Sequence, residues 1–407
     1  MNRLAIVVAV AGTIGAGAAS AQETLLPSTG WGLGSALSAW HFNKPLPQTG
    51  GAVANIAEVA IPFRMRSVFG RWSVDLSGAA AFGAVHFAAS KPAPGSGGGD
   101  AGENRVVSIA GPTDVKLRIT GPLYGDNLLL TAGLNLPSGK VGLDGDETSA
   151  LQAIGAPAVR MPVGAFGAGA GATLGVIRAF EGDEWAVAVG GSVEQRSEYS
   201  PIALLLAGGK SETRVTPGTA IHGTLGFDRA LGESRLSALL VGDLFSKDKV
   251  RFGGGGAPES SNDFQLGPQI TITSRLDFAA SAWRESSLNL AARMRSEFSD
   301  SAGAKVAGSG GTYFEGSVGG VRGGATGRGF VIGADARWHS GLEFTDALVG
   351  AAVSAVGVSI GVESAGVSRT TRFVVHGQYG TFDTGTASTS GFGVTLGMSV
   401  GARRGAR

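Results

Sequence analysis

The sequence predicts an all-β fold, a transmembrane antiparallel up-and-down β-barrel of about 14–16 strands that follows a cleaved N-terminal signal peptide. The first observation is alternation of apolar with small or polar residues, in runs of about ten positions separated by turn residues. The second is that short turns alternate with long loops, as in outer-membrane barrels. The third is composition: 69 of the 407 residues are glycine and only 16% are charged, against about 25% in ordinary soluble domains.

The composition also excludes several classes of protein. A hydrophobic content of 43% and a formal charge of +1 are unlike those of a disordered chain. The 33 basic and 32 acidic residues are spread along the chain, so we expect no nucleic acid partner. The absence of cysteine excludes disulfides, thiolate metal sites and a cysteine nucleophile.

Residues 1–21 have the pattern of an export signal. An apolar stretch of small and aliphatic residues follows Arg3, and Ala19-Ser20-Ala21 provides a small-x-small cleavage site before Gln22. We therefore expect export to the outer membrane of a Gram-negative-type envelope. No later segment has the roughly 18 consecutive uncharged apolar residues that a membrane-spanning helix needs.

The rest of the chain reads as one barrel domain, because no linker divides it. Trp31 to Phe42 alternates like a strand and Gly391 to Val400 forms the last one, which gives about sixteen strands and leaves both termini in the periplasm. The predicted organisation is a signal peptide at 1–21, an N-terminal segment with a possible first strand at 22–52, the barrel at 53–404 and a tail at 405–407.

The alternation predicts which side chains face lipid. Val59 and Met65 lie on one face of a run, whereas Arg64 and Arg66 lie on the other. A mid-membrane Arg on the lipid face costs about 2–4 kcal/mol, so the charged faces are expected to line the lumen. The run from Leu348 to Ile360 leaves its register open, because apolar residues occupy both of its faces.

Aromatic residues gather beside the predicted short turns. In barrels of this type such residues form a girdle at a membrane interface, and we expect the same here. The residues are Phe69, Trp72, Tyr124, Phe180, Trp185, Phe227, Phe278, Trp283 and Phe330.

Two other all-β architectures are alternatives. A soluble β-sandwich of this length requires at least two domains, and a secreted β-solenoid requires a fixed repeat period. The chain has neither a dividing linker nor such a period. Barrel closure also leaves no sheet edge in lipid, which favours the barrel.

The stretch from Gly111 to Lys140 suggests a family. It contains Gly-Pro-Thr-Asp114-Val, a short turn, and a second strand that ends Leu-Pro-Ser138-Gly. This resembles the signature hairpin of the meta-pathway phenol-degradation family of outer-membrane proteins, in which Gly-x-x-Asp-Val is followed by a strand that ends Leu-Pro-Thr-Gly. The family is similar to the long-chain fatty acid and aromatic hydrocarbon transporters, and the resemblance implies uptake of small hydrophobic molecules.

Two features depart from the pattern that the resemblance implies. The chain ends at Arg407 without the terminal aromatic residue that barrel-assembly signals commonly carry. The hydrocarbon transporters fill their lumen with an N-terminal plug, whereas only Gln22 to Gly51 is available here, so a full N-terminal plug is not expected.

Charged residues on the lumen-facing sides are candidates for a constriction. Rings of charged side chains select solutes in pores. The alternative is an ion-pair lattice that holds neighbouring strands together, because polar lumen groups need partners in either case. The candidates are Asp75, Asp114, Lys116, Arg118, Arg293, Arg295, Asp335 and Arg337.

An apolar cluster in a long predicted loop is a second candidate site. Exposed apolar clusters often mark binding surfaces, so this one is a candidate for capturing a hydrophobic solute. The alternative is a loop tucked against the rim of the barrel. The residues are Ile202, Leu204, Leu205 and Leu206.

The loop after Pro137 contains Asp144, Asp146 and Glu147, followed by a short predicted helix at Ser149 to Ile154. The acidic spacing lacks the full EF-hand pattern, so no metal site is expected. The five histidines are far apart and no catalytic signature is present. We expect no enzymatic activity and no cofactor.

The predicted function is passive uptake of small hydrophobic or aromatic compounds through an outer-membrane barrel. The alternatives are a general diffusion porin for small polar solutes and a plugged barrel with a structural or adhesive surface role. The expected partners are outer-membrane lipid, small hydrophobic solutes and the barrel-assembly machinery.

Overall fold

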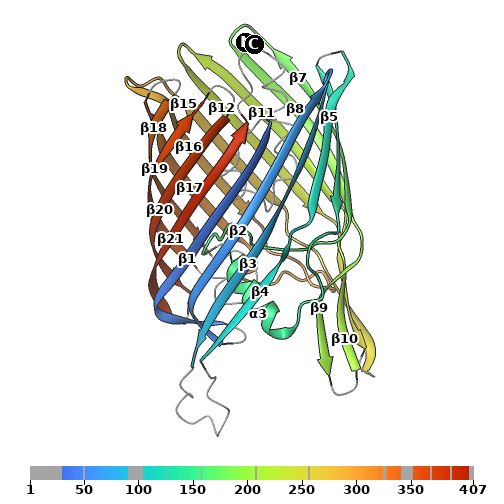
Figure 1. The fold of residues 1–407 in the computed structure, drawn as a ribbon. Helices are drawn as coiled ribbons and strands as arrows, with labels where there is room; N and C mark the ends of the chain where they lie inside the picture. The colour runs from blue at the N-terminus through green and yellow to red at the C-terminus, as the bar shows by residue number, and fades with distance from the viewer. Residues whose placement is uncertain are drawn as a thin grey trace.

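A computed structural model of the chain shows a closed, tilted antiparallel β-barrel, which confirms the predicted fold class (Figure 1). Among the described residues, one helix lies at one end of the barrel, and a smaller sheet projects from that end. The structure describes residues 30–48, 51–89, 104–125, 127–156, 158–206, 209–254, 257–323, 327–340, 352–366, 369–385 and 387–402.

The barrel closes because β1 pairs with both β2 and β21. The sheet has 17 strands. Because β4 and β5 pair with successive parts of the same strand, β3, they occupy one position in the wall, which therefore has 16 strand positions. The strands are β1 (Trp31–Gln48), β2 (Gly51–Phe69), β3 (Trp72–Ala88), β4 (Arg105–Pro112), β5 (Val115–Tyr124), β6 (Leu128–Leu136), β7 (Gly171–Glu181), β8 (Trp185–Arg196), β11 (Ala220–Leu231), β12 (Ser234–Phe245), β15 (Gln269–Asp277), β16 (Trp283–Arg295), β17 (Gly311–Arg322), β18 (Gly327–Ser340), β19 (Ala352–Ala365), β20 (Arg369–Asp383) and β21 (Ser388–Ala402).

Each strand presents apolar residues on its outer face, as predicted. On β18, Phe330 and Ile332 are exposed on the outer face, whereas Arg337 and His339 are buried on the inner face. On β19, the strand whose register the sequence left open, Val356 and its apolar neighbours at alternate positions are exposed. Residues 348–351 of that run lie outside the described residues.

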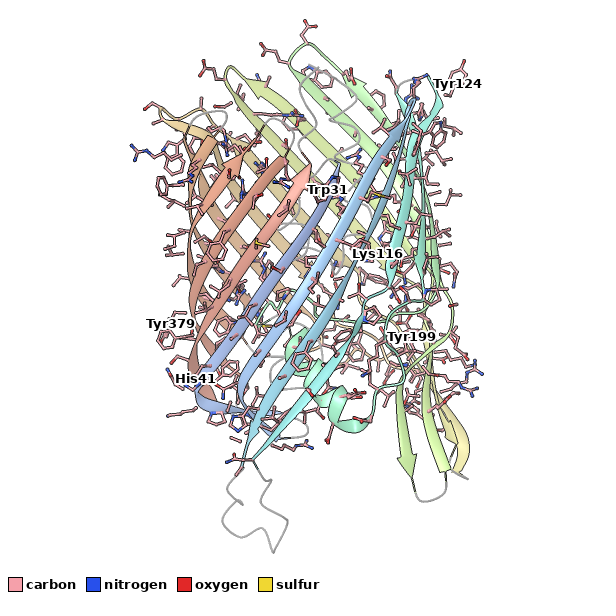
Figure 2. All side chains as sticks on the ribbon, viewed as in Figure 1. Trp31, His41, Lys116, Tyr124, Tyr199 and Tyr379 are labelled. Carbon is pink, nitrogen blue, oxygen red and sulfur yellow. The ribbon has the colours of Figure 1, made fainter. Side chains whose placement is uncertain are left out.

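At one end of the barrel, the turn end, strands are joined by short turns, and all the long connections lie at the other end, the loop end. The loop end also carries the two short connections between β1 and β2 and between β20 and β21. Trp31 and Tyr124 mark the turn end in Figure 2, and Tyr379 lies on the outer surface towards the loop end. Most of the predicted girdle is exposed at the turn end: Phe69, Trp72, Tyr124, Phe180, Trp185 and Phe330.

A second group of outward aromatic residues lies nearer the loop end. Phe314 stacks on Trp338 with ring centroids 5.8 Å apart, and the ring centroids of Tyr379 and Phe392 are 5.0 Å apart.

The distance between the two aromatic groups can be estimated along β18. Phe330 and Trp338 are separated by about 26 Å of strand at a rise of about 3.3 Å per residue. With a typical tilt this is roughly 20 Å of height, which matches the apolar band of an outer-membrane barrel.

A four-stranded sheet projects from the loop end: β9 (Tyr199–Leu206), β10 (Gly209–Thr216), β13 (Asp248–Gly254) and β14 (Ala257–Phe264). These strands form two hairpins in stretches where the sequence predicts loops. Residues 202–206 therefore belong to a strand, which corrects the expectation of a long irregular loop. The inner strands of the two hairpins pair with each other, and this pairing supplies backbone partners that a loop lacks.

The long connection between β6 and β7 contains the helix α3 (Gly145–Gly155). Asp144 caps α3 by accepting a hydrogen bond from the Glu147 N–H, and Asp146 and Glu147 occupy the first turn. The predicted short helix with an acidic start is therefore confirmed. None of the helices in the described residues is long and apolar enough to cross a membrane.

Candidate functional site: the plug segment and the lumen

The connection from residue 137 to residue 170 folds into the barrel at the loop end, and we call it the plug segment. Its apolar residues form one core with the inner faces of β1, β2, β3, β4, β19 and β20. In α3 the buried Ala150, Ala153 and Ile154 follow helical spacing, so one face of the helix packs on the wall. The plug residues of this core are Leu143, Ala150, Ala153, Ile154, Ala156, Ala158, Val159, Met161, Val163 and Phe166.

A close contact between Ile154 and Gly83 seats α3 against β3. A Cβ atom placed on Gly83 would lie 2.4 Å from Ile154 Cδ1, so a side chain there requires Ile154 to move. Glycine at position 83 thus provides the socket for the helix.

Three wall side chains hold the backbone of the plug segment. The Trp40 indole donates a hydrogen bond to the Val159 carbonyl at 2.8 Å. The Arg337 guanidinium donates to the Ala158 carbonyl at 3.0 Å, and Glu58 Oε1 accepts from the Val163 N–H at 2.8 Å. These bonds satisfy backbone groups that the plug segment carries into the barrel.

Asp114 holds the two ends of the plug segment together. Its carboxylate accepts hydrogen bonds from the Gly139 N–H at 2.8 Å and from the Ala168 N–H at 2.7 Å. The Asn135 side chain donates to the same carboxylate at 2.8 Å. Asp114 and Gly139 belong to the hairpin that carries the family resemblance, and Ser138 Oγ accepts from the Val115 N–H. The plug segment therefore begins and ends beside this hairpin, and we call the contacts of Asp114 with Gly139 and Ala168 the Asp114 neck.

Arg160 of the plug segment forms an ion pair with Glu315 of β17, and the Tyr313 hydroxyl donates to the same carboxylate. Arg160 has a positive φ of 52°, which is uncommon for a residue with a side chain. The half-buried ion pair offers a physical reason for that backbone conformation, because it directs Arg160 towards the wall.

The barrel wall is interrupted beside the plug segment. β6 ends at Leu136 and β7 begins at Gly171, while β4 continues towards the loop end paired with β3. Among the described residues no further ladder lies on the second edge of β4, and the plug segment covers it through α3 and through the Lys140 N–H, which donates to the Pro112 carbonyl. An uncovered sheet edge is not tolerated in lipid, so this edge marks a gap that the plug segment closes.

The opposite part of the wall carries a continuous row of polar side chains. The Nε2 atom of His222 lies 3.7 Å from Oε2 of Glu194, and its Nδ1 atom lies 2.7 Å from Oδ1 of Asp243. The Gln269 side chain donates to Asp243 at 3.0 Å and accepts from Arg295 at 3.1 Å. We call Glu194, His222, Asp243, Gln269 and Arg295 the polar row; they come from β8, β11, β12, β15 and β16 in turn.

The eight predicted constriction residues lie at several different places on the wall. Asp114 and Arg337 anchor the plug segment. Asp75 forms ion pairs with Arg64 and Arg66 near the turn end and lies opposite Arg118 in register. Asp335 accepts a hydrogen bond from His376 at 2.8 Å. The remaining residues are Arg293 and Arg295 on β16 and Lys116 on β5, which is exposed on the inner side of the wall.

The predicted apolar capture residues lie beside the plug segment. Ile202 forms a parallel bridge with Leu143, and the Leu143 N–H donates to the Pro201 carbonyl at 2.9 Å. The strand is thus docked at the rim, which was the alternative interpretation of this stretch. The side chains of Leu204, Leu205 and Leu206 lie outside the described residues.

The acidic residues of the plug segment are engaged by protein groups. Asp144 caps α3, Asp146 pairs with Arg105, and Glu147 pairs with Lys140. In the described part of the chain, no three histidine or acidic residues come together in a group suited to a metal ion.

Sequence reasoning missed Glu58, Trp40, Gly83 and Arg160 as functional residues. Glu58 carried a signal, because it is an acidic residue on the inner face of a strand whose neighbouring inner residues Ile56 and Ala60 are apolar. An isolated acid among apolar inner residues indicates a partner from outside the sheet.

No family model and no curated protein matches the chain. Solved structures of similar shape include the TodX monoaromatic hydrocarbon channel in a deltaS2 mutant form, with 9% identity, 93% of this chain and 91% of that chain covered, and a TM-score of 0.44. The toluene transporter TbuX of Ralstonia pickettii has 10% identity, 95% and 94% coverage, and a TM-score of 0.42. An outer membrane channel from Pseudomonas putida F1 has 14% identity, 67% and 90% coverage, and a TM-score of 0.34.

Proposed function

We propose that the chain is an outer-membrane channel for passive uptake of small hydrophobic or aromatic compounds, without enzymatic activity. Its N-terminal signal directs export, and the barrel-assembly machinery inserts it. The observation that carries this proposal is the gap in the wall beside β4, which an apolar plug segment closes. A gap of this kind offers a hydrophobic solute a path between the lumen and the membrane.

The packing of the plug segment argues against a wide aqueous pore. Its core contains fully buried aromatic side chains such as Trp40, Phe42 and Phe382 from the wall. Passage through the loop end therefore requires the plug segment to move. The polar groups near the turn end, such as the Arg372–Glu363 pair, then face the aqueous side of the path.

A reversible cross-link between the plug segment and β9 tests this proposal. Leu143 and Ile202 are bridge partners, and adjacent strands lie about 5 Å apart, which is within the range of a disulfide. The chain has no cysteine, so L143C/I202C introduces one possible pair. We expect oxidation to reduce uptake of labelled toluene by cells that express the variant, and a reductant to restore it.

The single variants L143C and I202C serve as controls, since neither can form the internal bond. Uptake that is unchanged by oxidation of the double variant would contradict the proposal. A large, steady conductance of the wild-type protein in a planar bilayer would instead support a diffusion porin.

The projecting sheet favours a second candidate, a plugged barrel that displays a surface structure. Sheets beyond the membrane are suited to contacts with other surfaces. Normal toluene uptake by cells that lack the protein would favour this candidate over the channel.

A further inference from the structure

Three arginines converge on the inner face of β16, β17 and β18, beside the plug segment. Arg293 lies opposite Tyr313 in register, with its guanidinium 5.8 Å from the ring centroid. Arg337 lies opposite Glu315 in register, the residue that pairs with Arg160. We call the group the arginine cluster: Arg160, Arg293 and Arg337.

The carboxylates near the cluster do not balance its charge. Glu315 uses one oxygen for Arg160 and the other for the Tyr313 hydroxyl. Asp335 is engaged by His376. The three guanidinium groups of Arg160, Arg293 and Arg337 therefore share two carboxylates, and the inner face keeps an excess of positive charge.

Several buried nitrogens of this region have no hydrogen-bond partner among the described residues. They are Nε of Arg293, Nε of Arg337, and both ring nitrogens of His339. His339 is 0% exposed and stacks on Tyr313, with ring centroids 6.3 Å apart and planes inclined by 28°. Leaving a buried polar group unpaired is unfavourable. The arrangement is therefore suited to an acceptor that comes from outside the chain.

We propose that the arginine cluster, with Tyr313 and His339, binds the carboxylate group of a small aromatic acid. The guanidinium fork matches a carboxylate in a bidentate fashion, and a flanking aromatic side chain offers a surface for the ring of the solute. Arg293 and Tyr313 are only half-buried, so this side of the cluster is open to the lumen. The inference rests on the proposed channel function and extends its solutes to aromatic anions.

Equilibrium binding to the purified full barrel in detergent tests this inference. The probes for calorimetric titration are benzoate, the neutral benzyl alcohol of similar size, and inorganic phosphate. We expect benzoate to bind about tenfold more tightly than benzyl alcohol, because only benzoate gains charge-assisted bonds. R293Q should weaken benzoate binding about tenfold and leave benzyl alcohol binding unchanged.

R275Q is the matched control, because Arg275 pairs with Asp277 near the turn end of β15, away from the cluster. Heat-modifiable migration on a gel shows whether each variant folds. If R293Q does not fold, R293K, which keeps the charge and loses the fork, should weaken benzoate binding and leave benzyl alcohol binding unchanged.

Equal affinities for benzoate and benzyl alcohol would overturn the inference, as would equal effects of R293Q and R275Q. Competition by phosphate as strong as that by benzoate itself would also overturn it, in favour of a general anion site. The toluene uptake test does not depend on this result, since toluene has no charge. The two proposals can therefore fail separately.

Discussion

The inner faces of the two sides of the barrel differ in chemistry. The plug-bearing wall, formed by β1 to β4 with β19 and β20, presents apolar residues such as Trp40, Phe87 and Phe382, all nearly inaccessible. The opposite wall, formed by β8, β11, β12, β15 and β16, presents the polar row, from Glu194 to Arg295. One half of the lumen is therefore packed like a protein core, and the other half is lined like an aqueous channel.

This difference shows that the residues of the outer face and those of the inner face are determined by different surroundings. Lipid contacts the outside everywhere, so every strand has an apolar outer face. The inner face depends on what covers it. The apolar inner residues Val353 and Ala355 of β19 contact the plug core, which explains why apolar residues occupy both faces of that strand in the sequence.

Removal of the plug segment is the strongest test of this comparison. Replacing residues 142–167 by a short Gly-Ser linker leaves the Asp114 neck and all wall strands in place. We expect conductance in a planar bilayer to rise from a low level to that of an open pore, because nothing else in the described residues fills the loop end. Shortening the β13–β14 hairpin is the control. Unchanged conductance after plug removal would show that the lumen is closed by something else.

The sequence predicts the outer face, the strand count and α3 well, because these features depend on local periodicity and capping. It also identifies Asp114 and Arg337 as inner residues. It does not reveal that their partners are backbone groups of a segment folded inside the barrel. Such contacts join residues far apart in the chain, and neither periodicity nor spacing encodes them. Glycine at position 83 illustrates this limit, since only its contact with Ile154 explains it.

I154A is expected to have the next largest effect. Truncating a buried isoleucine costs about 2–5 kcal/mol, and here the loss falls on the contact between α3 and β3. Hydrogen exchange of plug amides should therefore accelerate, while exchange in β11 and β12 stays slow.

The reciprocal change sharpens this test. G83A places a methyl group against the end of the Ile154 side chain, whereas in the I154A background the remaining neighbour is Ile109 at 3.6 Å, an ordinary van der Waals contact. The two substitutions should therefore be less destabilising together than the sum of their separate effects. Additive effects would mean that α3 is not seated on β3 as described.

Substitution of Glu58 should have an intermediate effect. E58L removes the acceptor of the Val163 N–H and leaves a buried donor unpaired, which costs about 1–3 kcal/mol. E58Q keeps an oxygen in the same place and should preserve most of the protection of residue 163. The measurement is exchange at that amide, and similar exchange in E58L and E58Q would contradict the assigned bond.

The smallest effect is expected on the opposite wall. H222N removes the side chain that links Glu194 to Asp243, but Arg196 still pairs with Glu194 and Gln269 still donates to Asp243, so the cost should be about 1 kcal/mol. Exchange of plug amides should not change, because no plug residue contacts His222 among the interactions described. Accelerated exchange in the plug segment would show that the two walls are coupled, and the division of the lumen into a packed half and a wet half would then be wrong.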